Sequence, residues 1–193
     1  MSRRSRLAGT AQAEACGYSL RCICGIRRTM AAVHVREKPH RLPRAVYRGA
    51  ITAAFTARIA GRQRPFPDPA VVGVASDLLR AAAEKHQCAV LIYCFIPDHV
   101  HLIVQGQSSA ADLWQTMTAF KQQSGYWFGR HRPSVRWQKD FYDHVVRASE
   151  DLRAQVRYVA DNPVRKGLAQ EWQLYPFTGA IGIDLADLLE SQL

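Results

Sequence analysis

The feature that most constrains the fold is a pair of apolar runs at residues 88–105, separated by a two-residue turn signal. The first run, CAVLIYCFI at residues 88–96, is short and continuous, which is typical of a buried strand. Pro97 and Asp98 follow it, and both residue types are common in turns. Residues 99–105 then return as a second run that is mostly apolar. We therefore predict a β-hairpin over 88–105, with its strands in the centre of a sheet.

Two further strands are expected on either side of this hairpin. Residues 46–57, VYRGAITAAFTA, partly alternate between apolar and other residues and suggest a first strand. Residues 137–147, WQKDFYDHVVR, contain a fourth.

Three helices are expected between and after the strands. Apolar residues at helical spacing predict a helix over about 69–86, with Asp68 as its cap and a proline in its first turn. A capping box formed by Ser109 and Asp112 precedes a second helix over roughly 110–128. A third begins at residues 149–151 and ends near Asn162, because the proline that follows disfavours helical geometry there.

The predicted order is β-α-β-β-α-β followed by an additional C-terminal helix, which is the ferredoxin-like α+β arrangement. We assign residues 45–180 to this domain, residues 1–44 to a basic, disordered N-terminal arm, and residues 181–193 to a C-terminal tail. Because many functions use this fold, function has to be argued from particular residues.

The positive charge of the chain is concentrated in two zones. The net charge is +10, and residues 1–44 hold 10 basic against 2 acidic residues. Residues 121–166 hold 10 basic against 5 acidic residues. Such zones favour a polyanionic partner, most commonly nucleic acid, and the alternative is a soluble basic surface.

The cysteines do not form a disulfide framework, since there are five and their spacing is irregular. Cys88 and Cys94 lie in apolar surroundings and are expected to be buried, reduced thiols. Cys22 and Cys24, with Cys16 nearby, are a weak zinc signal without a second ligand pair.

The sequence contains few signals for membrane-spanning or targeting segments. No segment has the apolar length to cross a membrane, and no apolar signal-peptide core is present, so we expect a cytoplasmic protein, associated with the nucleoid when bound to DNA. The first 29 residues loosely resemble a transit peptide, and a native start at Met30 is a further possibility.

Two histidines stand one residue apart in the returning strand of the hairpin, and therefore share one face of the sheet. His99 and His101 are a natural half of a metal site, although half-exposed histidines bonded to neighbours would show the same spacing. On the third helix, Tyr158 and Asn162 are stacked neighbours beside the apolar face. They would meet the histidines if that side of the helix covers the same face of the sheet. The alternative is that Tyr158 borders the core and Asn162 only ends the helix.

These segments together resemble the single-tyrosine HUH transposases, in particular the REP-associated tyrosine transposases of bacteria. The resemblance rests on IPDHVHLIV at 96–104, WQKDFYDHVVR at 137–147, YVADNPVRKG at 158–167 and YPFTG at 175–179. A HUH motif followed nearly sixty residues later by a Tyr and Asn-Pro-Val block is a specific combination. The resemblance covers about residues 45–180 and includes nothing of the arm.

The resemblance implies roles for individual residues. His99, His101 and Asn162 become ligands of a divalent ion, Mg²⁺ or Mn²⁺, and Tyr158 becomes the nucleophile. The implied reaction cleaves and rejoins single-stranded DNA next to a hairpin through a 5′-phosphotyrosine intermediate. Tyr126 does not match the tyrosine block, so we expect it to serve packing or DNA contact.

The remaining predictions concern partners. We expect contacts to the DNA backbone from Lys139, Arg147, Arg157 and Arg165, and a monomer or a homodimer in solution. The competing hypotheses are a non-catalytic protein of the same fold that binds hairpin DNA or RNA, and a zinc protein that uses Cys22, Cys24 and the histidines.

Overall fold

A computed structural model gives the structure of the chain, and it describes residues 42–61, 63–147 and 150–190. All of these residues fall within one compact unit, His40–Leu193. The basic arm assigned to residues 1–44 therefore lies almost entirely outside the described residues, as do Cys16, Cys22 and Cys24.

A five-stranded antiparallel sheet forms the centre of the domain. Its strands are β1 (Thr52–Arg58), β2 (Cys88–Ile96), β3 (His99–Gly106), β4 (Tyr142–Val146) and β5 (Thr178–Ile181). They lie in the order β4-β1-β3-β2-β5. The predicted hairpin is β2 and β3, which occupy the interior of the sheet. Because β1 pairs with both β3 and β4, residues from three distant parts of the sequence lie side by side.

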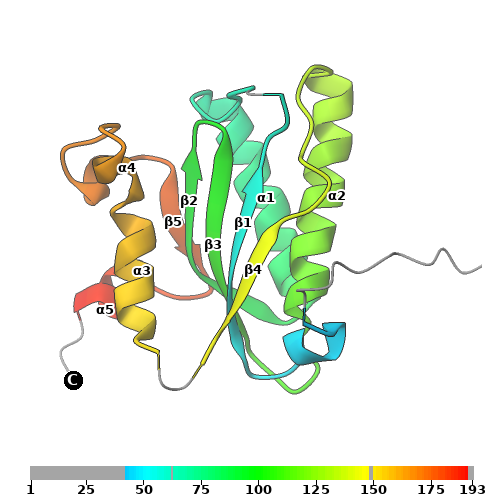
Figure 1. Cartoon of the computed structure of the whole chain (residues 1–193), viewed down its shortest axis with the longest axis vertical. Coiled ribbons are helices and arrows are strands. Elements are labelled where there is room, and N and C mark those ends of the chain that lie inside the picture. The colour runs from blue at the N-terminus through cyan, green and yellow to red at the C-terminus, as the bar shows by residue number, and fades with distance from the viewer. Residues whose placement is uncertain (1–41, 62, 148–149, 191–193) are drawn as a thin grey trace, which may run out of the picture. The chain divides into compact units, whose positions relative to one another are not determined.

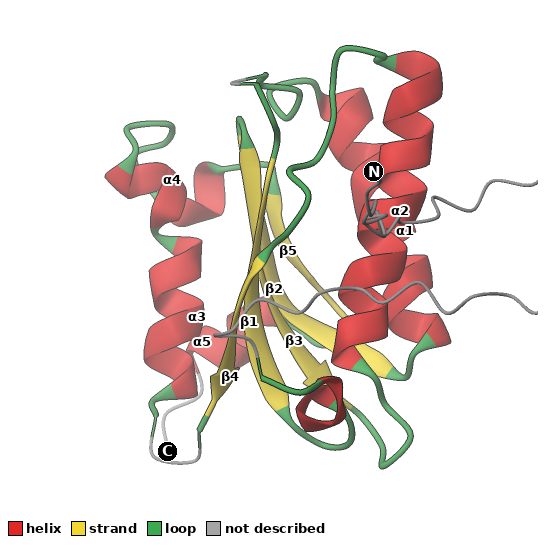
Figure 2. Ribbon diagram, turned by 45° about the vertical axis from the view of Figure 1, so that its right-hand side comes forward, coloured by secondary structure: helices red, strands yellow, loops and turns green. Residues whose placement is uncertain are grey.

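Helices cover both faces of this sheet. The helices α1 (Pro69–Lys85) and α2 (Leu113–His131) lie on one face, and α3 (Leu152–Ala160) lies on the other. Figure 2 shows the same layers from a second direction. The short elements are η1 (Arg44–Tyr47), α4 (Asn162–Arg165), η2 (Trp172–Leu174) and α5 (Leu185–Glu190). The predicted succession β-α-β-β-α-β with an additional helix is confirmed.

One predicted strand and one predicted cap differ from the structure. The segment predicted as one strand over 46–57 divides into η1 and β1, with a turn at Gly49, whose φ of 87° favours glycine. Asp112 rather than Ser109 caps α2, because the Asp112 carboxylate accepts a hydrogen bond from the Gln115 amide at 2.9 Å. Asp151 caps α3, whereas residues 148–149 lie outside the described part of the chain.

The strand β5 was not anticipated. It adds to the edge of β2 and is held near its start by Tyr175, whose hydroxyl donates to the Phe95 carbonyl oxygen at 2.8 Å. Residues 185–190 form a further helix, α5, in which Leu189 is buried. The strand β5 crosses residue 180, the predicted end of the domain, and α5 lies entirely beyond it.

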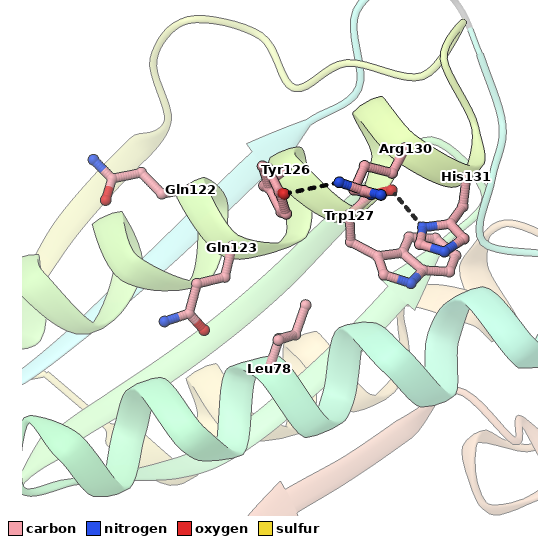
Figure 3. A pocket seen from close by; sticks show the side chains of 7 residues that line it. All are labelled: Leu78, Gln122, Gln123, Tyr126, Trp127, Arg130 and His131. Carbon is pink, nitrogen blue, oxygen red and sulfur yellow. Dashed lines mark hydrogen bonds between the residues drawn. The ribbon is translucent and has the colours of Figure 1, made fainter.

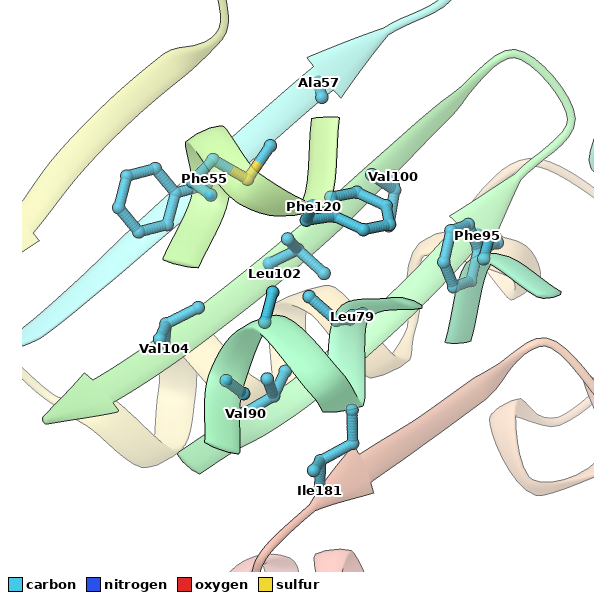
Figure 4. Packing of buried hydrophobic residues seen from close by; sticks show 14 of the residues in the cluster. Phe55, Ala57, Leu79, Val90, Phe95, Val100, Leu102, Val104, Phe120 and Ile181 are labelled. Carbon is cyan, nitrogen blue, oxygen red and sulfur yellow. The ribbon is translucent and has the colours of Figure 1, made fainter. Parts of the chain in front are cut away.

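Alternation along β3 divides the core into two clusters. Val100, Leu102 and Val104 pack with α1 and α2, as the labelled side chains in Figure 4 show. Ile103 on the opposite face packs with Val156 of α3. His99 and His101 alternate with the first set and so face the side of α3. The prediction that both histidines share one face of the sheet is confirmed.

The two described cysteines are buried free thiols, as predicted for Cys88 and Cys94. Burial raises the pKa of the Cys94 thiol to about 11, so this thiol stays protonated at neutral pH. In the part of the chain that the structure describes, no helix combines the length and the apolar character that crossing a bilayer requires.

Candidate functional site

The two histidine rings are each held by a hydrogen bond at Nδ1. His99 Nδ1 lies 2.6 Å from Oδ1 of Asp98, and His101 Nδ1 lies 2.9 Å from Oγ1 of Thr56 on the neighbouring strand. The ring centroids are 4.9 Å apart, with the ring planes at 82°. If each Nδ1–H donates to its partner, Nε2 of each ring keeps a lone pair. This is how histidines that bind metal ions are commonly oriented.

The surroundings favour neutral imidazoles. Burial lowers the pKa of His99, and the carboxylate of Asp98 offsets this only in part. Burial also lowers the pKa of His101 to about 4, helped by His99 and by the positive charges of Arg58 and Lys166. For Asp98, burial disfavours ionisation, but the hydrogen bond and charge of His99 lower the pKa of the carboxyl overall. The pair is therefore uncharged at neutral pH, which is the form that can bind a cation.

Tyr158 lies on the same side of the sheet as the histidines. A cavity of about 500 Å³ between the sheet and α3 is lined by both Tyr158 and His101. Tyr158 is 59% exposed, so a large ligand can reach its hydroxyl. Arg165 lies over its ring, with the guanidinium carbon 3.6 Å from the ring centroid, and donates to the Tyr158 carbonyl oxygen at 3.1 Å. Tyr158 thus shares one cavity with a histidine, as the sequence hypothesis required.

Asn162 is the first residue of α4, four positions after Tyr158. Its side chain is buried, and its Nδ2 atom has no hydrogen-bond partner in the described part of the chain. A buried amide without a partner is costly unless a ligand or water completes it. The nitrogen and oxygen of an amide are assigned by their surroundings, so a rotated amide would present Oδ1 instead. Asn162 can therefore supply a neutral oxygen ligand.

Two neutral imidazoles and one neutral amide are the kinds of side chain that can bind a divalent ion. Among the described residues, no group of three or more His, Cys, Asp and Glu side chains is placed to hold a metal ion. A site at His99 and His101 therefore needs a ligand of another type, and an amide such as that of Asn162 is of a suitable chemical type. Amide oxygen suits Mg²⁺ and Mn²⁺, while imidazole suits the later transition metals.

His144 of β4 and Gln155 of α3 line the same cavity and are joined through Glu150, which precedes α3. His144 Nε2 lies 2.8 Å from Oε2 of Glu150, which also accepts from Gln155 Nε2 at 2.7 Å. The hydrogen bond from His144 lowers the pKa of the Glu150 carboxyl. The Nε2 atom of His144 is thus engaged by Glu150, whereas His99 and His101 use Nδ1 for their hydrogen bonds. Exposed Tyr142 adds an aromatic ring to the same wall.

The four basic residues predicted to contact DNA are all exposed. Lys139 precedes β4 and Arg147 follows it, whereas Arg157 and Arg165 lie on α3 and α4 beside Tyr158. Lys166, a further candidate for backbone contact, and Arg58 carry positive charges near the histidines, and Arg58 was not predicted. Thr56 and Asp98 were also missed. Asp98 could have been predicted from the sequence, because it directly precedes His99. Thr56 could not, because only the register of β1 against β3 brings it beside His101.

Tyr126 is separated from the histidines by the sheet. It lies on α2 among the residues shown in Figure 3, where its hydroxyl accepts from Arg130 at 3.2 Å. Trp127 stacks on the ring of His131 on the same helix, with centroids 4.8 Å apart. The prediction that Tyr126 is not part of the site with the histidines agrees with this placement.

The comparisons with known proteins assign the chain to a family. The family model described as "Transposase IS200 like" matches residues 53–162. The chain belongs to the IS200-like transposase family. The matched range begins in β1 and ends at Asn162, so it includes both histidines and Tyr158.

Three individual proteins are similar to this chain. A putative REP-associated tyrosine transposase from Haemophilus influenzae is 26% identical over 110 residues, which cover 51% of this chain and 62% of the relative. The chain therefore spans less than two thirds of the length of that relative. A solved structure of a REP-associated tyrosine transposase bound to a REP hairpin has a TM-score of 0.62 at 20% identity, covering 74% of this chain and 82% of the other. A putative transposase from Deinococcus radiodurans has a TM-score of 0.44 at 19% identity, covering 58% and 90%.

Proposed function

We propose that this protein cleaves and rejoins single-stranded DNA next to a hairpin, with Tyr158 as the nucleophile. The observation that carries the proposal is the cavity that Tyr158 shares with His101, in a member of the IS200-like transposase family. A tyrosine and a histidine pair in one open cavity suit a phosphodiester, which needs a nucleophile on one side and charge stabilisation on the other.

The covalent step transfers the phosphate from one oxygen to another. The phenolic oxygen of Tyr158 bonds to phosphorus as the bond from phosphorus to the 3′-oxygen breaks. The phenolic proton is lost, and the 3′-oxygen leaves as a hydroxyl after gaining a proton. The product is a 5′-phosphotyrosine and a free 3′-end. Attack by a 3′-hydroxyl on the phosphotyrosine reverses these bond changes and joins two strands without an external energy source.

We propose that His99, His101 and Asn162 hold Mg²⁺ or Mn²⁺ for this reaction. The ion supplies Lewis-acid stabilisation of the charge on the phosphate oxygens. All three ligands are neutral, so they leave the charge of the cation uncompensated. Asp98 and Thr56 act through the histidines by fixing the tautomer in which Nε2 can bind.

The DNA partner is supported by charge and by family. The solved relative is described as bound to a REP hairpin, and this chain has exposed cations on both sides of Tyr158. We propose that Arg157 and Arg165 contact the phosphates beside the cleavage position, and that Lys139 and Arg147 contact the backbone farther along. Such contacts give affinity and register without reading sequence.

The test is a denaturing gel of the purified protein incubated with labelled, hairpin-flanked single-stranded DNA and Mn²⁺. We expect a protein–DNA adduct that resists boiling in detergent, with the nucleotide mapped to Tyr158 by peptide mass spectrometry. DNA that shifts on a native gel but stays uncut with several hairpins would instead favour a non-catalytic hairpin-binding protein.

A conservative change at Thr56 tests the proposed orientation of His101. Thr56→Val keeps the shape of the side chain but removes the hydroxyl that His101 Nδ1 contacts. We expect Mn²⁺ affinity, measured by titration calorimetry, to fall about 10-fold to 100-fold, the usual cost of losing such a partner. Thr52→Val on the same strand is the control and should bind Mn²⁺ as the wild type does. Equal affinity in both variants would contradict the role given to Thr56.

A further inference from the structure

A second cavity lies at the turn between β2 and β3, where Asp98, the hydrogen-bond partner of His99, forms part of its wall. It has a volume of about 340 Å³ and is walled by Arg64, Asp98 and Lys166. Arg64 comes from the loop after β1, Asp98 from the turn between β2 and β3, and Lys166 from the end of α4. Three loops distant in sequence therefore meet beside His99. The volume lies within the range of about 300–1,000 Å³ that small-molecule sites occupy.

The two cations of this cavity are available to a ligand. Neither the Arg64 nor the Lys166 side chain has a hydrogen-bond or ion-pair partner in the described part of the chain, and both are exposed. Asp98 is the one acid in the lining, and its carboxylate is engaged by His99 at 2.6 Å. The lining therefore holds two cations against one carboxylate, which leaves a net positive charge beside the hydrogen-bond partner of His99.

The rest of the lining is apolar. Ile96, Pro97 and Leu168 complete the wall, and Leu168 is 39% exposed. Two cations beside an apolar surface match the chemistry of a nucleotide, in which a phosphate is joined to a sugar and a flat base. A free anion would use the cations but not the apolar wall.

Each cavity is connected to one member of the histidine pair. His101 lines the larger one, and Asp98, which holds His99, lines the smaller one. No lining residue is common to both. A strand with its reacting phosphate at His99 and His101 would extend a neighbouring nucleotide into the smaller cavity. We propose that this cavity binds the nucleotide next to the scissile phosphate, with Arg64 and Lys166 contacting its own phosphate. The inference rests on the proposed function.

The experiment measures DNA binding by fluorescence anisotropy in a Tyr158→Phe parent, so that no covalent product forms. One probe is a fluorescein-labelled DNA hairpin with single-stranded flanks of randomised sequence on both sides, and the other is the same hairpin without flanks. The test variant is Arg64→Ala/Lys166→Ala. The matched control is Arg80→Ala/Lys85→Ala, which removes the same charge from exposed positions on α1, across the sheet.

We expect the test variant to bind the flanked hairpin at least about 10-fold more weakly than the parent, with little change on the hairpin alone. The slope of log affinity against log salt should become shallower by about 0.7 for each phosphate that the variant no longer neutralises. The control should change less than about threefold on either probe, and Arg64→Lys/Lys166→Arg should retain most of the parent's affinity. Melting curves establish that all variants are folded.

Two results overturn the inference and are distinguishable from each other. If the parent prefers the flanked hairpin but the test variant loses no more affinity than the control, the cavity does not bind the flanking nucleotide. The proposed function would then stand. If the parent binds neither probe, hairpin-flanked DNA is not its substrate, and the proposed function fails together with the inference.

Discussion

Tyr158→Phe is expected to abolish the covalent protein–DNA adduct. Phenylalanine keeps the ring on which Arg165 lies, but it has no oxygen to bond to phosphorus. Because no second route to a phosphotyrosine at this position exists, the yield of adduct should fall on the order of 10³-fold or more, to the detection limit of a denaturing gel. Tyr158 is 59% exposed, so the loss of its hydroxyl should leave the fold intact.

Tyr126→Phe is the matched control for this result. Tyr126 is 68% exposed and also lies near an arginine, but it is on α2 across the sheet from the histidines. Its variant should form the adduct at the wild-type rate. DNA binding by Tyr158→Phe on a native gel should stay within about threefold of wild type, because only the covalent step is removed. An adduct that survives in Tyr158→Phe and disappears in Tyr126→Phe would show that the nucleophile is misassigned.

His99→Ala and His101→Ala are expected to remove Mn²⁺ binding together with DNA cleavage. Each change deletes an imidazole that we propose as a direct ligand. The loss of a residue that only orients a ligand typically costs 10-fold to 100-fold in affinity, so losing the ligand should cost on the order of 100-fold or more. Titration calorimetry with Mn²⁺ gives a measurement that is independent of the DNA reaction.

His144→Ala separates this effect from a general loss of histidines. His144 lines the larger cavity on β4, but Glu150 holds its Nε2 at 2.8 Å. Its variant should bind Mn²⁺ within about threefold of wild type. If His144→Ala weakened Mn²⁺ binding as strongly as His99→Ala, His144 would take part in holding the ion. Unchanged binding in both His99→Ala and His101→Ala would exclude the proposed ligands altogether.

Much of the fold was predictable because its signals are local. The two apolar runs and the turn between them predicted β2 and β3, and the cap at Asp68 placed the start of α1. The strand β5 was missed because TGAI is a four-residue edge strand whose pairing with β2 joins segments about 85 residues apart, at Thr178 and Cys94. A pattern of four residues carries too little periodicity to distinguish a strand from a loop.

The candidate site was predictable in its principal residues and not in their supporting contacts. The spacing of His99 and His101 placed both on one face of β3, and the helical spacing of Tyr158 placed it beside the apolar side of α3. The hydrogen bond between His101 and Thr56 joins residues 45 positions apart and depends on the register of β1 against β3. Register follows from the packing of both faces of the sheet, which no single segment encodes.

The sequence by itself determined the hairpin of β2 and β3, the three main helices and which of their side chains share a face, because these properties depend on neighbours within one turn or two residues. Only the tertiary structure decided that α3 covers the face with the histidines, that the Asn162 amide is buried without a partner, and that Arg64 and Lys166 meet beside Asp98. The physical reason is that these contacts form when apolar surfaces far apart in the chain are buried together. Burial of apolar surface positions whole helices and strands. The polar side chains on these elements are brought together as a result.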